Sequence, residues 1–563
     1  MLGFKVHGQK TFWQVVMGGS KVSLKLPLDP RWVKSRQKLV NQIKRQIESR
    51  YGSQTAWIGS YQKEYFRDFF RPWRIAKKSD LIEEIQNSDV VFGGDFHAFP
   101  QAQRTHMKIL RSLPVGQTFT LALEVLPSEK NDLIQAYVEG RISESDFLKK
   151  IDWDNQWGFK WENYRPLIEI ARKRNSRVIG LGPSPDKAQP GNPKSFDRYA
   201  ARVLKKTLSS TSDLVYVIAG DFHIARGHLP KALRALYKGA PPREVIVYLN
   251  PERIYFQLAR RGLENQVDVI KFNRRHFCVM GSPPWVKWQS YLMYLEENYD
   301  HDLEEDFEED DIDYTDHVTS VIRFIARDLG LKIKTDKLQV FTLNSHNLDA
   351  VLEKYLDKEK LELADELLET NRSFFLPNAG VIVLAQTSVN HAAALAGQFI
   401  HAQISRRKTL LWNMPNEFKS LIWVEAIGFF ISKLVNHKRH AQTLTDLKEE
   451  LAVMHPKDKG RDALLLALDY RMKELVYLHE DVEVESEFKP SQLTSYIEAA
   501  RFLGGMLGER IYLAYRSRRM KRQFMLKLLS RSPSKRGFEE FYILTLKELE
   551  KFKPPIKSRK ERL

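Results

Sequence analysis

Residues 89–97 read DVVFGGDFH, and residues 214–223 read LVYVIAGDFH. Each copy is a short apolar run that ends in Gly-Asp-Phe-His. Continuous apolar runs of this length are typical of strands in a mostly parallel sheet, which is covered on both faces. We therefore expect two buried strands of one sheet, each followed by an aspartate and a histidine.

Three further runs of this kind surround the first two, at 118–126 (TFTLALEVL), 176–182 (SRVIGLG) and 243–249 (REVIVYL). Stretches with helical spacing lie between them, at 101–113, 163–175 and 196–208. Strands that alternate with helices indicate βαβ units with right-handed crossovers. The fold class that we expect is α/β, with a mostly parallel sheet flanked by helices.

The second half of the chain has a different pattern. Residues 300–316, DHDLEEDFEEDDIDYTD, carry eleven acidic residues and no Lys or Arg, and mostly helical periodicity follows. We expect a separate all-helical C-terminal domain. The predicted parts are an N-terminal strand and helix extension packed on the core (1–80), the α/β domain (81–290), an acidic linker (291–320) and the helical domain with a basic tail (321–563).

The cysteine count and the apolar segments of the chain exclude several classes of protein. The 563 residues contain one cysteine, Cys278, so neither a disulfide within the chain nor a cysteine metal cluster is possible. No signal peptide begins the sequence, and the apolar window 421–435 is too short and too charged to span a membrane. We therefore expect a cytoplasmic protein without a transmembrane segment.

The net charge of +18 raises nucleic acid or anionic membrane as partners, through the Lys- and Arg-rich tail that starts at Arg516. No zinc finger or RNA-binding aromatic signature accompanies this charge. Nucleic acid and membrane therefore stay minor hypotheses.

Five ionisable residues follow the predicted strands, and parallel strands place such residues at one edge of the sheet. They are Asp95, His97, Glu124, Asp221 and His223. A buried carboxylate needs a partner, because burying it alone costs several kcal/mol. In a strand-like Asp-x-His both side chains point to the same face, so the aspartate can fix the tautomer of its own or a neighbouring histidine.

Three chemistries fit this cluster, and the spacing does not choose between them. A set of histidines and carboxylates can activate water or hold a divalent metal, and a histidine or a tyrosine can ligate haem iron. A zinc-protease helix, a Gly-x-Ser-x-Gly elbow, a phosphate-binding loop and a dinucleotide-binding loop are all absent from the motifs.

Five motifs follow one another over roughly residues 80–250: DLIEEIQNSDVVFGGDFHAFPQAQRTHMKIL, LALEVL, DWDNQWGFKWENYRPLIEIAR, VIGLGPSP and VYVIAGDFHIARGHLP. In this order they resemble the ChaN-like family, a haem-binding branch of a group that includes erythromycin esterases and Tiki- and TraB-type proteins. The chain departs from the family in having Asp95 where Glu is usual and Gly182 where Asn is common.

The resemblance implies that the α/β domain binds haem or a related small ligand. The residues that it assigns to ligand binding are His97, Arg104, His106, Glu124, Tyr164, Asp221, His223 and His228. Tyr164, with Trp157, Trp161 and Phe222, would supply the walls of an apolar cleft.

Two alternatives stay open. One is an acid–base or metal-assisted hydrolase that uses Asp95, His97, Glu124 and His223, the same four residues being the expected ligands of a divalent metal. The other is a non-catalytic interaction protein in which the helical domain and the basic tail carry the function.

Overall fold

The structure, a computed structural model, describes residues 30–51, 56–183, 192–299, 314–343, 345, 347–458, 460–482, 488–551 and 556–563. Its contacts divide the chain into two units. The sheet unit comprises the described residues of Pro27–Asp300 and of Glu561–Leu563, and the helical unit comprises those of His301–Lys560. The strands expected before residue 30 and the acidic run 300–313 lie outside the described residues. The four-part division of the chain stays a prediction.

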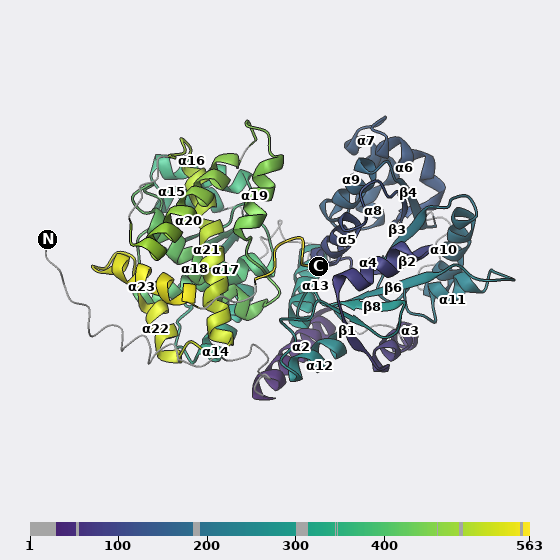
Figure 1. Ribbon diagram of the computed structural model, residues 1–563, viewed down its shortest axis with the longest axis horizontal. Helices are drawn as coiled ribbons and strands as arrows, with labels where there is room; N and C mark the ends of the chain where they lie inside the picture. Colours follow the sequence, from purple (N-terminus) through teal and green to yellow (C-terminus); the bar gives the residue numbers. More distant parts are fainter. Residues whose placement is uncertain are drawn as a thin grey trace, which may run out of the picture. The chain divides into compact units, whose positions relative to one another are not determined.

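The sheet unit is built on eight strands in the order β1-β7-β8-β6-β2-β5-β3-β4 (Figure 1). Their bounds are Arg74–Ala76 (β1), Val90–Asp95 (β2), Phe119–Pro127 (β3), Arg177–Gly182 (β4), Leu214–Gly220 (β5), Glu244–Leu249 (β6), Val269–Lys271 (β7) and His276–Val279 (β8). The strands from β8 to β4 run parallel, and β7 and β1 add an antiparallel edge. The predicted fold class is confirmed. Strands β1, β7 and β8 were not expected, because three or four residues are too few to show a period.

Helices cover both faces of this sheet. They are Pro30–Tyr51 (α2), Ala56–Arg67 (α3), Lys78–Gln86 (α4), Pro100–Arg111 (α5), Asn131–Val138 (α6), Glu144–Ile151 (α7), Trp153–Gln156 (α8), Arg165–Lys173 (α9), Pro193–Leu208 (α10), Leu229–Arg234 (α11), Glu252–Arg260 (α12) and Pro284–Tyr299 (α13). Figure 1 shows α5 and α9 on one side of the sheet and α10 and α11 on the other. Helices α5 and α10 each begin with a proline. Proline has no N–H, so this position leaves no backbone donor without a partner in the first turn.

The strand register brings the expected edge together. Asp95 at the end of β2 pairs with Gly220 at the end of β5. Gly93 and Leu123 both pair with Ile218, so Glu124 follows at the level of these strand ends. The chain passes from β2 to β3 and later returns to place β5 between them, and α/β folds bind ligands where the strand order reverses in this way.

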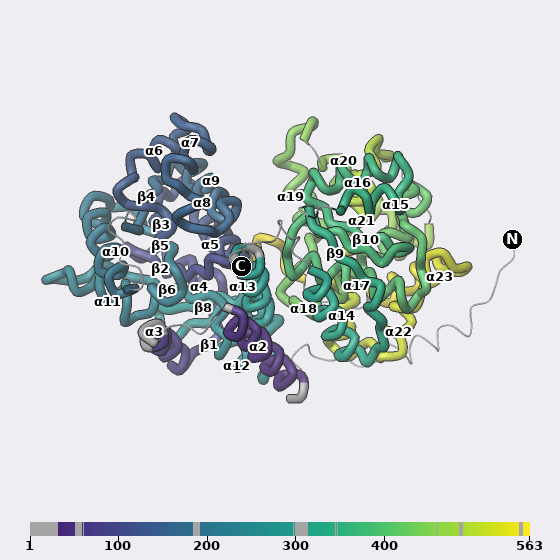
Figure 2. Tube along the Cα trace, turned by 180° about the vertical axis from the view of Figure 1, so that it is seen from behind, coloured from purple at the N-terminus to yellow at the C-terminus, as the bar shows by residue number. Residues whose placement is uncertain are grey.

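The helical unit contains ten helices among the residues that the structure describes. They are Thr315–Leu329 (α14), Leu348–Tyr355 (α15), Lys358–Glu369 (α16), Val389–Ser405 (α17), Phe418–Val435 (α18), Leu444–Val453 (α19), Arg461–Glu480 (α20), Leu493–Arg516 (α21), Arg522–Ser530 (α22) and Phe538–Lys551 (α23). It also holds a small sheet in the order β10-β11-β9, with strands Gln339–Thr342 (β9), Phe374–Leu376 (β10) and Val381–Leu384 (β11). Figure 2 labels β9 and β10 of this sheet. The domain is therefore mainly helical, as expected, but not all-helical. Residues 381–388, VIVLAQTS, belong to the stretch expected to be helical, but they do not start a helix. Their β-branched first half forms β11, and Ser388 caps α17.

Glycines bring the central helices α17, α18 and α21 close together. A methyl group on Gly397 would lie 3.0 Å from the Cα of Gly428, and one on Gly508 would lie 2.5 Å from the Ala426 carbonyl. Helix α18, which contains the apolar window 421–435, is almost wholly buried by this packing. None of the described helices combines the length and the apolar character that crossing a bilayer requires.

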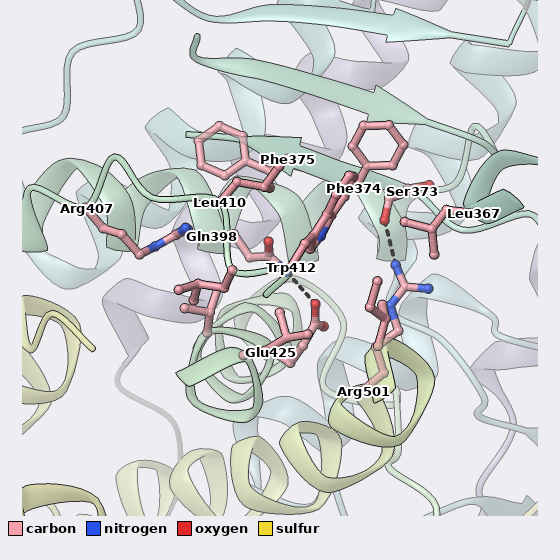
Figure 3. Close-up of a pocket in the computed structure, with 14 residues that line it drawn as sticks. Leu367, Ser373, Phe374, Phe375, Gln398, Arg407, Leu410, Trp412, Glu425 and Arg501 are labelled. Carbon is pink, nitrogen blue, oxygen red and sulfur yellow. Dashed lines mark hydrogen bonds between the residues drawn. The ribbon is translucent and has the colours of Figure 1, made fainter. Parts of the chain in front are cut away.

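A small polar pocket lies beside this packing (Figure 3). Its cavity volume is about 30 Å³, which is room for a water molecule or two. Gln398 donates to Glu425 at 2.9 Å, and Arg501 donates to the Ser373 carbonyl at 2.6 Å, while Trp412 forms a wall. These bonds satisfy polar groups inside the unit, so the pocket is a feature of its packing.

Candidate functional site

One half of the site forms where β2 ends. The Nδ1 of His97 lies 3.0 Å from a carboxylate oxygen of Asp95 and 3.1 Å from the hydroxyl of Tyr164. Tyr164 donates to the same Asp95 oxygen at 2.8 Å, and Gln103 donates to the other oxygen at 2.5 Å. The aspartate is 2 % exposed. A carboxylate that binds Nδ1–H leaves the lone pair of a neutral imidazole on Nε2.

The other half repeats this arrangement with different elements. The Nδ1 of His223 lies 2.8 Å from Asp197 of α10 and 3.0 Å from the hydroxyl of Tyr61 on α3. Tyr61 donates to the second oxygen of Asp197 at 2.6 Å. Each histidine is therefore held through Nδ1 by one aspartate and one tyrosine, and each presents Nε2.

Both histidines border the position that a side chain on residue 220 would occupy, which we call the space above Gly220. A methyl group on Gly220 would lie 3.4 Å from Nε2 of His97, 3.4 Å from Oε2 of Glu124 and 3.5 Å from Cδ2 of His223. Glu124 accepts the Gly220 N–H at 2.5 Å, and its other oxygen lies 3.7 Å from Nε2 of His223. Two imidazoles and a carboxylate thus surround a space that exists because residue 220 has no side chain.

The two imidazoles favour the protonated form. Burial alone would lower the pKa of His97, but its hydrogen bond to Asp95 and the charges of Asp95 and Glu124 raise that pKa from 6.5 to about 9. Burial also opposes the charge on His223, yet Glu124 and Asp197 raise its pKa above the ordinary value. Near pH 7 His97 is therefore protonated, and a ligand that binds its Nε2 has to displace a proton from that nitrogen.

Asp221 lies at the expected edge but does not hold His223. Its carboxylate accepts from Lys287 of α13 at 2.7 Å, and the ammonium of Lys287 lies 4.2 Å from the centre of the Phe96 ring. The two copies of Gly-Asp-Phe-His therefore differ. Strand β2 continues through Asp95, whose carboxylate reaches His97 in the turn that follows, whereas β5 ends at Gly220 and Asp221 begins a turn.

His106 lies below the site. Its Nε2 is 2.8 Å from the Gly94 carbonyl, and its Nδ1 is 3.0 Å from the hydroxyl of Tyr216. The ring is fully buried, and burial lowers its pKa. A methyl group on Gly93 would lie 2.5 Å from this ring. His106 thus supports β2 from beneath, with both ring nitrogens engaged, and Arg104 is on the exposed side of α5.

His228 also has a supporting position. Its ring stacks on that of Tyr61 with centroids 3.6 Å apart, and its Nδ1 lies 2.6 Å from the Phe222 carbonyl. Its Nε2 is 3.2 Å from Glu64. His228 therefore helps to place Tyr61, which in turn holds His223.

The aromatic residues expected to line a cleft divide into two groups. Trp157 lies beside His97, with ring centroids 5.1 Å apart, and Phe159 lies at the same distance. Trp161 instead packs on Trp153, and Phe222 packs on Tyr65 of α3. Trp157 is thus placed as expected, and Phe159 is a wall residue that the motifs did not indicate.

Four polar residues of the site were missed in the sequence: Tyr61, Gln103, Asp197 and Lys287. Tyr61 is separated from His223 by 162 positions, and it comes from the segment that we expected to be an extension of the core. Helical periodicity at 196–208 predicted α10, and the single acidic residue on its buried side, Asp197, was the available signal.

Within the ranges that the structure describes, no three His, Cys, Asp or Glu side chains form a group that could hold a metal ion. The predicted set of Asp95, His97, Glu124 and His223 therefore gains no support as a metal site. Two of its members, Asp95 and His97, already form a hydrogen bond with each other through Nδ1 of His97.

Comparison with known proteins supports the resemblance. Residues 81–190 match the family model described as haem-binding uptake, Tiki superfamily, ChaN, so the likeness to the ChaN-like family is confirmed for this segment. A solved structure, cofacial haem binding to ChaN of Campylobacter jejuni, also matches, at 19% identity over 31% of this chain and 86% of that chain, with a TM-score of 0.26. No curated protein matches the chain. The matched segment includes His97 and Glu124 but ends before Asp197 and His223.

Proposed function

We propose that the sheet unit binds haem or a related ligand above Gly220, between His97, Glu124 and His223. The observation that carries this proposal is the pair of imidazoles beside Gly220, each held through Nδ1 by an aspartate and a tyrosine. His97 presents Nε2 to the space above Gly220, and the Nε2 of His223 lies 3.7 Å from Glu124 at the border of that space. Histidines that ligate metals commonly donate their other ring nitrogen to a carboxylate in this way. The haem-binding description of the family that matches residues 81–190 supports the choice of ligand.

These residues fit haem chemically. Haem would supply an iron atom that can accept an imidazole nitrogen. His97 and His223 would offer that nitrogen, and Asp95 and Asp197 would orient the rings. Trp157 and Phe159 beside His97 would cover an apolar surface of the ligand.

Titration of the full chain with haemin, followed by Soret absorbance, tests this proposal. We expect saturable binding that weakens by roughly tenfold or more in His97→Ala and in His223→Ala. His455→Ala is the matched control, because His455 is an exposed histidine of the helical unit. A Soret titration that neither site substitution changes would overturn the proposal.

A second candidate is an acid–base hydrolase at the same position. It is favoured by the 3.7 Å approach of Glu124 to Nε2 of His223, which is close enough for the two groups to share a water molecule. Metal-free protein should then hydrolyse an activated ester, and Glu124→Gln should abolish this activity. Such hydrolysis without haem binding would replace the first proposal with the second.

A further inference from the structure

A basic groove lies in the helical unit, far in sequence from the site described above. It is formed by Ile322, Arg323, Ala326 and Arg327 of α14 and by the segment Leu331–Lys334 that follows this helix. Its volume is about 480 Å³, which lies in the range of sites that bind ligands or peptide segments.

The groove combines an apolar floor with a rim of cations. Ile322 and Ala326 are buried, and Leu331 and Ile333 are half-buried. The rim is made of the exposed side chains of Arg323, Arg327, Lys332 and Lys334. In the part of the chain that the structure describes, these four side chains form no hydrogen bond or ion pair. Such a surface suits an acidic polypeptide that also carries apolar side chains.

The backbone of the groove is open as well. Residues 331–335 are not part of a helix or strand, and apolar and basic side chains alternate along them. Among the described residues, the N–H and C=O groups of 332–334 make no main-chain hydrogen bond. Unpaired main chain of this kind can bind an added strand, so the occupant should be able to extend along it.

We propose that the basic groove binds the chain's own acidic segment, residues 301–313. This segment, HDLEEDFEEDDID, has nine acidic residues, no Lys or Arg, and the apolar residues Leu303, Phe307 and Ile312. It ends next to Tyr314, directly before α14, and α14 forms one wall of the groove. From Thr315 to Arg327 the helix rises roughly 18 Å, whereas 13 extended residues reach about 43 Å. The segment is therefore long enough to fold back, and its attachment raises its local concentration at the groove.

The groove lining argues against nucleic acid as the occupant, and the pairing of tail cations argues against the tail as the place where the acidic segment binds. No aromatic side chain is among the groove residues, whereas proteins that bind single-stranded nucleic acid stack bases on aromatic rings. The tail cations Lys547 and Lys560 are already paired, with Asp481 and Glu449, so the acidic segment has fewer free cations to meet there.

A labelled peptide of residues 301–313 tests the proposal. The receptor is the full chain in which the acids of 302–313 are replaced by Asn and Gln, so that its groove has no attached acidic occupant. We expect saturable binding that weakens as salt is added, and binding to the wild-type chain at least about tenfold weaker, because its own segment competes. Equal affinity for both chains would overturn the proposal.

Charge reversal locates the binding. Arg323→Glu/Arg327→Glu in the neutralised chain should abolish peptide binding, whereas Lys358→Glu/Lys408→Glu, which reverses two exposed charges elsewhere in the unit, should retain it. If the first variant melts early, Arg327→Ala should still show a partial loss. Peptide binding that survives loss of these arginines would overturn the proposal, as would arginine-dependent binding of an RNA oligonucleotide or of phosphatidylserine vesicles in place of the peptide.

Discussion

At the scale of single residues, the candidate site depends on which atom of each histidine is already bonded. Asp95 and Asp197 occupy the Nδ1 atoms, and the tyrosines Tyr164 and Tyr61 bridge to the same carboxylates. What remains for a ligand is the pair of Nε2 atoms near Glu124. The aspartates therefore act through the histidines, and their loss should weaken ligand binding without removing a group that touches the ligand.

Asp197→Asn tests this division of roles. An amide that offers its N–H to Nδ1 would favour the tautomer with the proton on Nε2, so we expect haemin affinity to fall by about 10- to 100-fold. Asp213→Asn, which changes a carboxylate that accepts from Thr118 instead, should leave the titration unchanged. Equal affinity in Asp197→Asn and wild type would show that the orientation of His223 does not matter for binding.

The raised pKa of His97 predicts a pH dependence of stability. Because the folded-state pKa of about 9 exceeds the unfolded value of 6.5, this histidine stabilises the fold fully below pH 6.5. That contribution is lost as the pH rises through 9. Denaturant unfolding at pH 6 and pH 10 should show the loss in wild type and a smaller one in His97→Gln. An NMR titration that places the pKa of His97 near 6.5 would contradict this account.

The site residues that could be predicted from the sequence are those that strand topology alone places. Asp95, His97, Glu124 and His223 follow strands, and parallel strands must end at one edge. Tyr61 and Asp197 could not be predicted, because helical periodicity does not indicate which edge of the sheet a helix crosses. Asp221 was expected to occupy the same kind of position as Asp95. This was not resolved by the sequence, because the residue at which a strand ends is set by pairing between distant segments.

At the scale of elements, the helical unit depends on glycines where helices cross. A methyl group on Gly508 of α21 would lie 2.5 Å from the Ala426 carbonyl of α18, and backbone cannot move aside cheaply. Gly508→Ala should therefore destabilise the unit by about 1–3 kcal/mol. Gly505→Ala is the control on the same helix, because its methyl group would meet Ala441 at an ordinary 3.5 Å. That control should be neutral or stabilising by about 0.5–1 kcal/mol, and thermal melting that ranks the two the other way would contradict the packing described.

The same pair of helices contains a buried ion pair. Lys433 of α18 donates to Glu509 of α21, and the two side chains are almost completely enclosed. Lys433→Met should cost about 3–5 kcal/mol, because it removes the lysine partner of a buried carboxylate and leaves His440 beside it, 3.6 Å away. Lys433→Met/Glu509→Gln should recover part of this loss, since Gln removes the charge and can still accept the Ala441 N–H. Denaturant unfolding that shows no recovery would indicate that Glu509 is neutral in the folded protein.

At the scale of the whole molecule, the two units carry different chemistry. Every side chain of the candidate site comes from the sheet unit, and the basic groove belongs to the helical unit. From the sequence we predicted an α/β fold followed by a helical part, because the change from alternating strands and helices to helices alone is a property of long windows. The sequence did not predict the three-stranded sheet of the helical unit, whose strands are too short to show in such windows.

The central claim is that a ligand occupies the space above Gly220. Haemin titration of Gly220→Val tests it most directly, because this change fills the space and leaves His97, Glu124 and His223 in the chain. The matched control is Gly239→Val, since a side chain there meets nothing within 4 Å. We predict that Gly220→Val abolishes the saturable Soret change and that Gly239→Val keeps the wild-type affinity. Wild-type affinity in a folded Gly220→Val protein would contradict the account.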